Sequence, residues 1–60
     1  MKSLRELRLK NYLSQAELAH KAGLATATIN RLENGRSKPV FKTIRVLAKA
    51  LGVEPGEIDF

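Results

Sequence analysis

Few side chains in this sequence could carry out chemistry on their own, because its 60 residues include no cysteine and only one histidine. His20 has no Asp, Ser or Cys placed to form a proton relay with it, so we interpret it as a solvated surface residue. Without cysteine a Cys/His zinc site cannot form. The four glycines are spread along the chain instead of forming a phosphate-binding loop. The sequence therefore predicts no enzyme, no metal site and no cofactor.

Basic side chains are far more abundant. Eleven Lys and Arg stand against six Asp and Glu. Three of the acids lie in the last seven residues, so residues 1–53 carry eleven basic and three acidic side chains, a net charge of +8. This excess makes a polyanion the first partner to consider, although a solvated basic surface explains the charge equally well. We expect the acidic last residues to lie away from any bound polyanion.

Local signals indicate where the helices that position these side chains begin and end. Ser3 with Glu6, and Ser14 with Glu17, have the spacing of capping boxes, which start helices. Gly23 can adopt the left-handed conformation that is preferred just after a helix, so it marks a helix end. With the apolar periodicity, these signals predict one helix after residue 3, further helices at residues 15–22, 26–34 and 41–51, and a short last turn within residues 55–60.

The second and third of these helices are joined by a very tight turn, so they must cross steeply. A steep crossing needs a small residue at the contact, and Ala19 stands there with Ile29 to fill the space. The remaining inward positions carry no charge, since they are filled by Leu18, Ala22, Leu24 and Leu32. The same helical periodicity turns four residues of the third helix outward, namely Ala27, Asn30, Arg31 and Asn34.

These features resemble the lambda-repressor-like helix-turn-helix family, also called the Cro/C1 or xenobiotic-response-element type. The matching segments are Leu7-Arg8, Leu13-Ser14-Gln15, Leu18-Ala19, Ala22-Gly23-Leu24, Thr28-Ile29, Leu32-Glu33-Asn34-Gly35, Lys38-Pro39 and Leu47-Ala48-Lys49-Ala50-Leu51-Gly52-Val53. The resemblance implies an all-α compact bundle of about five short helices, one domain over residues 1–60, with the helix-turn-helix unit at about residues 15–34. It also implies a cytoplasmic transcriptional regulator, a repressor, whose third helix reads the major groove of double-stranded DNA. Such proteins act as homodimers on palindromic operators.

The resemblance also assigns contact roles to individual residues. Arg31 could bond guanine O6 and N7, and Asn30 could pair with adenine N6 and N7. The complete set expected to read bases is Thr26, Ala27, Thr28, Asn30 and Arg31. The set expected to contact phosphates is Gln15, at a helix N-terminus, with Asn34, Arg36, Lys38 and Lys42.

Arg8 needs a separate explanation, because it shares the buried face of the first helix with Leu4 and Leu7. Glu33 is the only acid on the inward edge of the third helix, and the family resemblance implies the same pair. We therefore predict a structural ion pair between Arg8 and Glu33. The alternative is that Arg8 extends along the apolar surface to reach water.

The chain departs from the family pattern at three helix boundaries. Ala25 stands where Ser or Thr often caps the third helix. Val40 stands where Ser often caps the fourth helix. Asn11-Tyr12 stands where Gly often ends the first helix. Loss of a cap costs about 0.5–2 kcal/mol. The third helix is thus expected to fray at its start or to begin one residue later.

Two questions stay open at the level of sequence. The same fold can serve mainly to bind a protein, for example as an antitoxin that neutralises a toxin. Such antitoxins usually carry a toxin-binding extension, which we do not expect in this chain. Val46, Val53, Ile58 and Phe60 could form a dimer patch, but the last three could equally cover the open end of the core. No apolar run approaches the ~18 residues that span a bilayer, so no membrane partner is expected.

Overall fold

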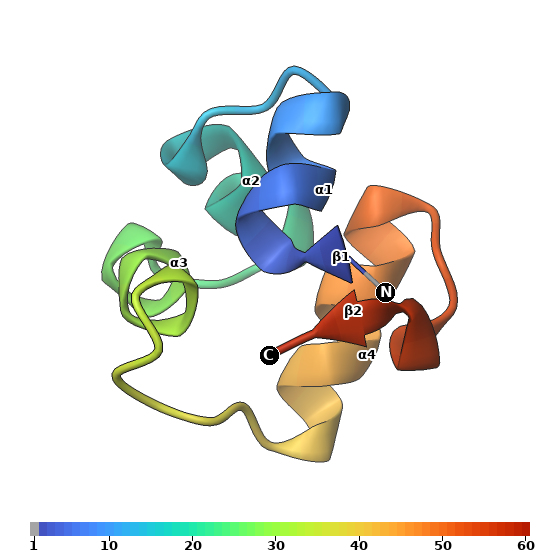
Figure 1. Ribbon diagram of the computed structural model, residues 1–60. Helices are drawn as coiled ribbons and strands as arrows, with labels where there is room; N and C mark the ends of the chain where they lie inside the picture. Colours follow the sequence, from blue (N-terminus) through green and yellow to red (C-terminus); the bar gives the residue numbers. More distant parts are fainter. Residues whose placement is uncertain (1) are drawn as a thin grey trace.

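The computed structural model describes residues 2–60. Four α-helices, one 3₁₀ turn (η1) and two short strands follow one another in the order β1 (Lys2–Ser3), α1 (Leu4–Lys10), α2 (Gln15–Ala22), α3 (Thr26–Glu33), α4 (Phe41–Leu51), η1 (Pro55–Glu57) and β2 (Ile58–Asp59). In Figure 1, α1 and α2 lie at the top of the molecule, α3 at one side, and α4 below and opposite to α3. In residues 2–60 no helix is long and apolar enough to cross a membrane.

The first two helices begin where the capping boxes predict. The Ser3 side chain accepts a hydrogen bond from the Glu6 backbone N–H, and the Glu6 carboxylate accepts one from the Ser3 N–H. Ser14 and Glu17 make the same reciprocal pair of bonds at the start of α2. At the other end of α2, Gly23 has a φ of 71°, which a glycine adopts without the steric cost of a Cβ.

The core is formed where the inward faces of all four helices meet. Leu18 of α2, Ile29 of α3 and Leu47 of α4 are its largest fully buried side chains. Ala19, only 2% exposed, lies in the same core cluster as Ile29, as expected for a small residue at the crossing of α2 and α3. The packing therefore holds α3 by one face and leaves the other to solvent.

The short last turn expected within residues 55–60 is present as the 3₁₀ turn η1, so residues 2–60 form four α-helices and this turn where about five helices were expected. The chain forms the three-residue turn η1 there and then strand β2, which pairs in parallel with β1 through Lys2 opposite Ile58 and Ser3 opposite Asp59. Figure 1 shows the two strands side by side. Only Ile58 in this segment is fully buried, so it lacks the apolar stripe that would hold a helix on the core.

The residues considered for a dimer patch mostly belong to the core of the single chain. Ile58 is 4% exposed, and Val53 and Phe60 pack against the core cluster while partly buried. Val46, expected to be exposed, is half-buried beside a groove between α2 and α4. Val53, Ile58 and Phe60 therefore close the open end of the core, as the second of the two sequence interpretations proposed.

The end of α1 shows the cost of a missing glycine. Tyr12 has a φ of 57° and a side chain that is 94% exposed. For residues with a Cβ, the left-handed conformation costs roughly 1–2 kcal/mol. The departure from the family pattern at Asn11-Tyr12 thus leaves the turn geometry intact and adds local strain.

Candidate nucleic-acid interface

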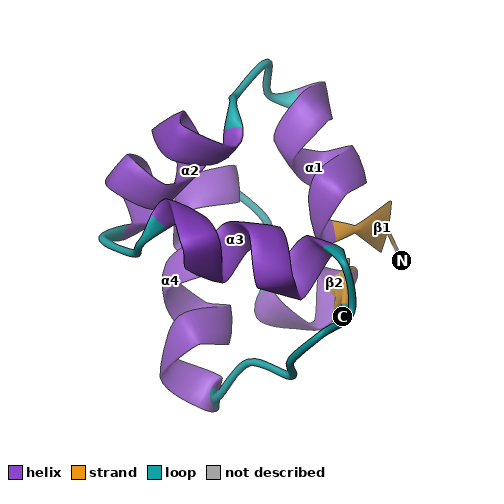
Figure 2. Cartoon of the chain, turned by 90° about the vertical axis from the view of Figure 1, so that its left-hand side faces the viewer, coloured by secondary structure: helices purple, strands orange, loops and turns teal. Residues whose placement is uncertain are grey.

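Helix α3 presents one face to solvent, and Figure 2 shows it running across the front of the molecule. Of the five residues expected to read bases, four are exposed: Thr26, Ala27, Asn30 and Arg31. Thr28 is half-buried and lies nearer the packed side of the helix. The structure therefore brings four of the predicted readers onto one open surface and turns the fifth toward the molecule.

The start of α3 has no side-chain cap. Ala25 occupies the N-cap position, and the nearest bond there runs between backbone atoms, from the Thr28 N–H to the Ala25 carbonyl oxygen at 3.0 Å. The helix nevertheless begins at Thr26, so the expected delay by one residue does not occur. Val40 at the start of α4 likewise makes no side-chain cap bond.

The predicted ion pair between α1 and the end of α3 is present. Arg8 Nε donates to Glu33 Oε2 at 2.6 Å and Arg8 Nη2 donates to Glu33 Oε1 at 3.1 Å, while Nη1 donates to the Leu13 carbonyl oxygen at 2.9 Å. The two charged side chains are only 9% and 4% exposed. Arg8 therefore does not reach water, and its fork-shaped guanidinium joins α1, the α1–α2 turn and α3.

Gln15 belongs to the same network. Its Nε2 donates to Glu33 Oε1 at 3.1 Å, which the sequence interpretation missed. Burial would raise the pKa of Glu33, but the hydrogen bonds from Arg8 and Gln15 and the charge of Arg8 outweigh burial and lower that pKa below its ordinary value of 4.5. One amide hydrogen of Gln15 is thus committed to Glu33, and the second stays available at the N-terminus of α2.

The cationic residues expected at phosphates follow α3 along one exposed path. Arg36 and Lys38 lie in the loop after α3, and Lys42 lies in the first turn of α4, all exposed. Lys38 Nζ donates to the Phe60 carbonyl oxygen at 2.7 Å. The backbone of the last residue therefore lies against this basic loop.

A pair of amide side chains lies at the end of the exposed face. Asn34, the C-cap residue of α3, donates from Nδ2 to Asn30 Oδ1 at 3.1 Å. Both residues were expected at DNA, but their pairing was not. Their spacing of four residues, which places side chains one above the other on a helix, is the signal that could have revealed it.

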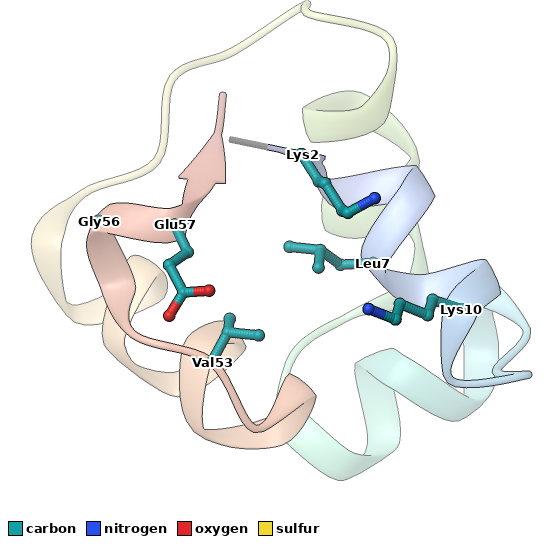
Figure 3. A pocket seen from close by; sticks show the side chains of 6 residues that line it. All are labelled: Lys2, Leu7, Lys10, Val53, Gly56 and Glu57. Atoms are coloured by element: carbon teal, nitrogen blue, oxygen red, sulfur yellow. The ribbon is translucent and has the colours of Figure 1, made fainter.

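Other cavities and side-chain clusters lie apart from this face. A pocket of about 280 Å³ opens between α1 and the segment after α4. Figure 3 shows Lys2, Leu7 and Lys10 on one side of it and Val53, Gly56 and Glu57 on the other, none of them a predicted DNA contact. In the part of the chain that the structure describes, no group of three or more His, Asp or Glu side chains could hold a metal ion.

Comparison with known proteins agrees with this geometry. A family model described as helix-turn-helix matches residues 4–58. An uncharacterized HTH-type transcriptional regulator, YozG of Bacillus subtilis (strain 168), is 34% identical over 50 residues, which are 82% of this chain and 60% of the relative. The chain thus spans about 60% of the length of this curated relative.

A solved structure extends the agreement from sequence to shape. The restriction-modification controller protein C.AhdI from Aeromonas hydrophila superposes with a TM-score of 0.87 at 41% sequence identity, and the match covers 90% of this chain and 82% of the other. The expected family and the mostly helical fold are therefore confirmed, with four α-helices and a 3₁₀ turn in residues 2–60 instead of five helices. The chain belongs to the helix-turn-helix family of the Cro/C1 type.

Proposed function

We propose that this chain binds double-stranded DNA sequence-specifically as a transcriptional regulator, with α3 in the major groove. The observation that carries the proposal is the exposed face of α3, which is held from behind by the core and by the Arg8–Glu33 ion pair. The HTH-type regulator and the restriction-modification controller protein that resemble this chain support it. As a repressor on bacterial or phage DNA, the protein would act in the cytoplasm.

The exposed side chains of α3 supply groups that can distinguish bases. Arg31 is the main candidate, because a guanidinium bonds guanine O6 and N7 bidentately, and Asn30 is suited to adenine. Thr26 and Ala27 lie at the start of the same face. Thr28, being half-buried, is the weakest candidate of the set.

The residues after α3 supply groups that position the protein without reading bases. Arg36, Lys38 and Lys42 carry positive charges along the exposed path into α4, and Gln15 adds an amide at the start of α2. Asn34 was expected in the same set, but its side chain bonds Asn30. Glu33, the one acid of α3, is neutralised by Arg8 and so does not repel phosphates.

A second copy of the chain would supply the remaining specificity. One recognition helix covers few base pairs, and dimers of this class bind two half-sites about 34 Å apart, which favours a palindromic operator. Arg36, Lys38 and Lys42 on each of two copies then give about six phosphate contacts. For six contacts the logarithm of the binding constant should fall with the logarithm of salt concentration at a slope near −5.

The test uses binding sites selected from random duplex DNA and measures affinity between about 50 and 200 mM salt. Lys42→Ala should make the slope shallower by about one for each cation removed. Lys49→Ala is the matched control, since it removes the same charge from an exposed position two turns later on the same helix. Arg31→Ala should weaken binding by about 1–3 kcal/mol at one base pair only.

Two outcomes would contradict the proposal. If no salt-dependent binding to duplex DNA were found, the fold would serve as a protein-interaction module, as in an antitoxin that binds a toxin. If Arg31→Ala and Lys42→Ala both weakened every sequence by the same factor, α3 would not read bases.

A further inference from the structure

Two exposed side chains at the end of α3 are joined to each other by a hydrogen bond. Asn34 Nδ2 donates to Asn30 Oδ1 at 3.1 Å, and the Asn34 backbone N–H donates to the Asn30 carbonyl oxygen, also at 3.1 Å. Asn34 is therefore bonded to Asn30 through both its backbone and its side chain. Both side chains lie outside the core, so their contact is not needed to hold the helix in place.

The bond is made with one orientation of the Asn30 amide. The oxygen and nitrogen of an asparagine amide have nearly the same shape, and the torsion that exchanges them is broad for an exposed side chain. Asn34 is the donor of this bond in the structure, and Asn30 turns its Oδ1 toward Asn34. Its Nδ2, on the opposite side of Cγ, is then turned away from Asn34 and keeps its hydrogens for another acceptor.

The order of donor and acceptor matters to a base. Adenine presents the N7 acceptor beside the N6 donor in the major groove, so a bidentate amide must offer nitrogen to N7 and oxygen to N6 in that order. We propose that Asn34 is a positioning residue that fixes the amide orientation of Asn30 and thereby sets which base pair Asn30 selects. The inference rests on the proposed function, because it requires α3 to lie in the major groove.

This role differs from a phosphate contact in what a substitution should change. If Asn34 bound a phosphate, replacing it would weaken binding to every sequence alike. If Asn34 positions Asn30, replacing it should change the ratio of affinities at the single base pair that faces Asn30. The two roles are therefore separated by ratios of affinity and not by affinity itself.

Two variants of Asn34 should change the orientation of the Asn30 amide in different ways. Asn34→Ala removes the partner and frees the Asn30 torsion, so preference at that base pair should fall by about 3- to 10-fold. Asn34→Asp leaves only acceptor oxygens at that position, so Asn30 must turn Nδ2 toward it and Oδ1 away. The preferred base pair at that position should then change. The added negative charge weakens all sequences together and cancels in the ratio.

The experiment compares the parent and both variants on a selected duplex and on duplexes changed at one base pair each. Asn30→Ala supplies the matched background, because the Asn34 variants should not alter the base preference once the reader is gone. Circular dichroism checks that each variant keeps the helical fold, which is expected since both side chains are exposed. The expected result is a change confined to one base pair that disappears in the Asn30→Ala background.

The inference is overturned if Asn34→Ala and Asn34→Asp lower the affinity for every duplex by one common factor. It is also overturned if the altered preference persists in the Asn30→Ala background. Failure of the proposed function looks different, because the parent protein itself would then show no base preference on any duplex.

Discussion

The starts of α2 and α3 differ in how they are fixed, although the two helices have the same length and lie in one unit. At α2, Ser14 and Glu17 close a capping box. At α3, Ala25 offers no side-chain acceptor, and the strongest anchor lies at the opposite end, where Glu33 binds Arg8 and Gln15. The boundary of α2 is thus set by neighbours in sequence, and that of α3 by residues brought together in the folded state.

The helix expected to contact DNA therefore depends on tertiary structure for its position. Ile29 and Leu32 bury one face of α3, and the ion pair fixes its last turn. Its first turn is left without a side-chain acceptor of its own. The same division holds for the other pair of helices, since α1 has a capping box and the N-cap residue of α4, Val40, makes no side-chain cap bond.

The largest expected effect comes from breaking the anchor of α3. Glu33→Gln removes the charge that neutralises Arg8, which is only 8% exposed, and a buried charge left unpaired costs about 3–5 kcal/mol. In a domain of this size the melting temperature should fall by at least about 12 °C. Thermal unfolding followed by circular dichroism measures the change.

Two further variants separate the ion pair from charge in general. Asp59→Asn removes one negative charge from an exposed position and should change the melting temperature little. Adding Arg8→Met to Glu33→Gln should restore much of the lost stability, because the unpaired cation is then gone. An unchanged melting temperature for Glu33→Gln would show that the anchor contributes nothing.

Acid should weaken both the capping boxes and the ion pair that anchors α3, through different carboxylates. Hydrogen bonds from the backbone and side chain of Ser14 lower the pKa of Glu17, and those from Ser3 lower the pKa of Glu6. The pKa of Glu33 is lowered through Arg8 and Gln15 despite burial. Because each pKa is lower in the folded state, the stability it contributes is complete above about pH 4.5 and is lost as the pH falls through the folded value.

Unfolding by urea as a function of pH separates these contributions. Glu33→Gln should flatten the acid side of the stability profile, and Glu17→Gln should flatten it less, because Glu17 is exposed. Equal slopes for the parent and Glu33→Gln below about pH 4.5 would show that Glu33 titrates alike in the folded and unfolded states.

The smallest expected effect comes from exchanging the caps. Ala25→Ser supplies the acceptor that α3 lacks and should stabilise the fold by about 1 kcal/mol, while Ser14→Ala should destabilise it by a similar amount. These changes correspond to about 4–8 °C in melting temperature, in opposite directions. Ala27→Ser is the matched control, because a hydroxyl within α3 caps no backbone N–H. If Ala27→Ser raised the melting temperature as much as Ala25→Ser, the missing cap would not explain the effect.

The part of the fold that could be predicted was the part determined by residues close together in the sequence. The start of α1, the start of α2 and its end at Gly23, and the inward stripe with Leu18 and Ile29 all follow from capping signals and helical spacing. The ion pair was also predictable, because Arg8 lay on a buried face that held no other charge. Strand β2 was not, since pairing with β1 depends on residues from opposite ends of the sequence, which no local window contains.

Within the candidate site, exposure was predicted better than hydrogen bonding. The helical wheel placed Ala27, Asn30 and Arg31 outward correctly, because it depends only on the regular geometry of the helix. The bond between Asn34 and Asn30 was missed although their spacing of four residues indicates it, and the helical wheel could not show that Lys38 bonds the Phe60 carbonyl oxygen. Such bonds depend on which rotamers and loop paths the folded chain leaves available.

The parallel pairing of β1 with β2 has a consequence for the order in which the molecule folds. Bringing Lys2 beside Ile58 closes a loop of nearly the whole chain, and the entropy of closing a loop grows with its length. The contact between α2 and α3 joins segments only a few residues apart and carries no such cost. The two strands should therefore pair after the transition state, so that shortening Ile58 to valine speeds unfolding and leaves the folding rate unchanged.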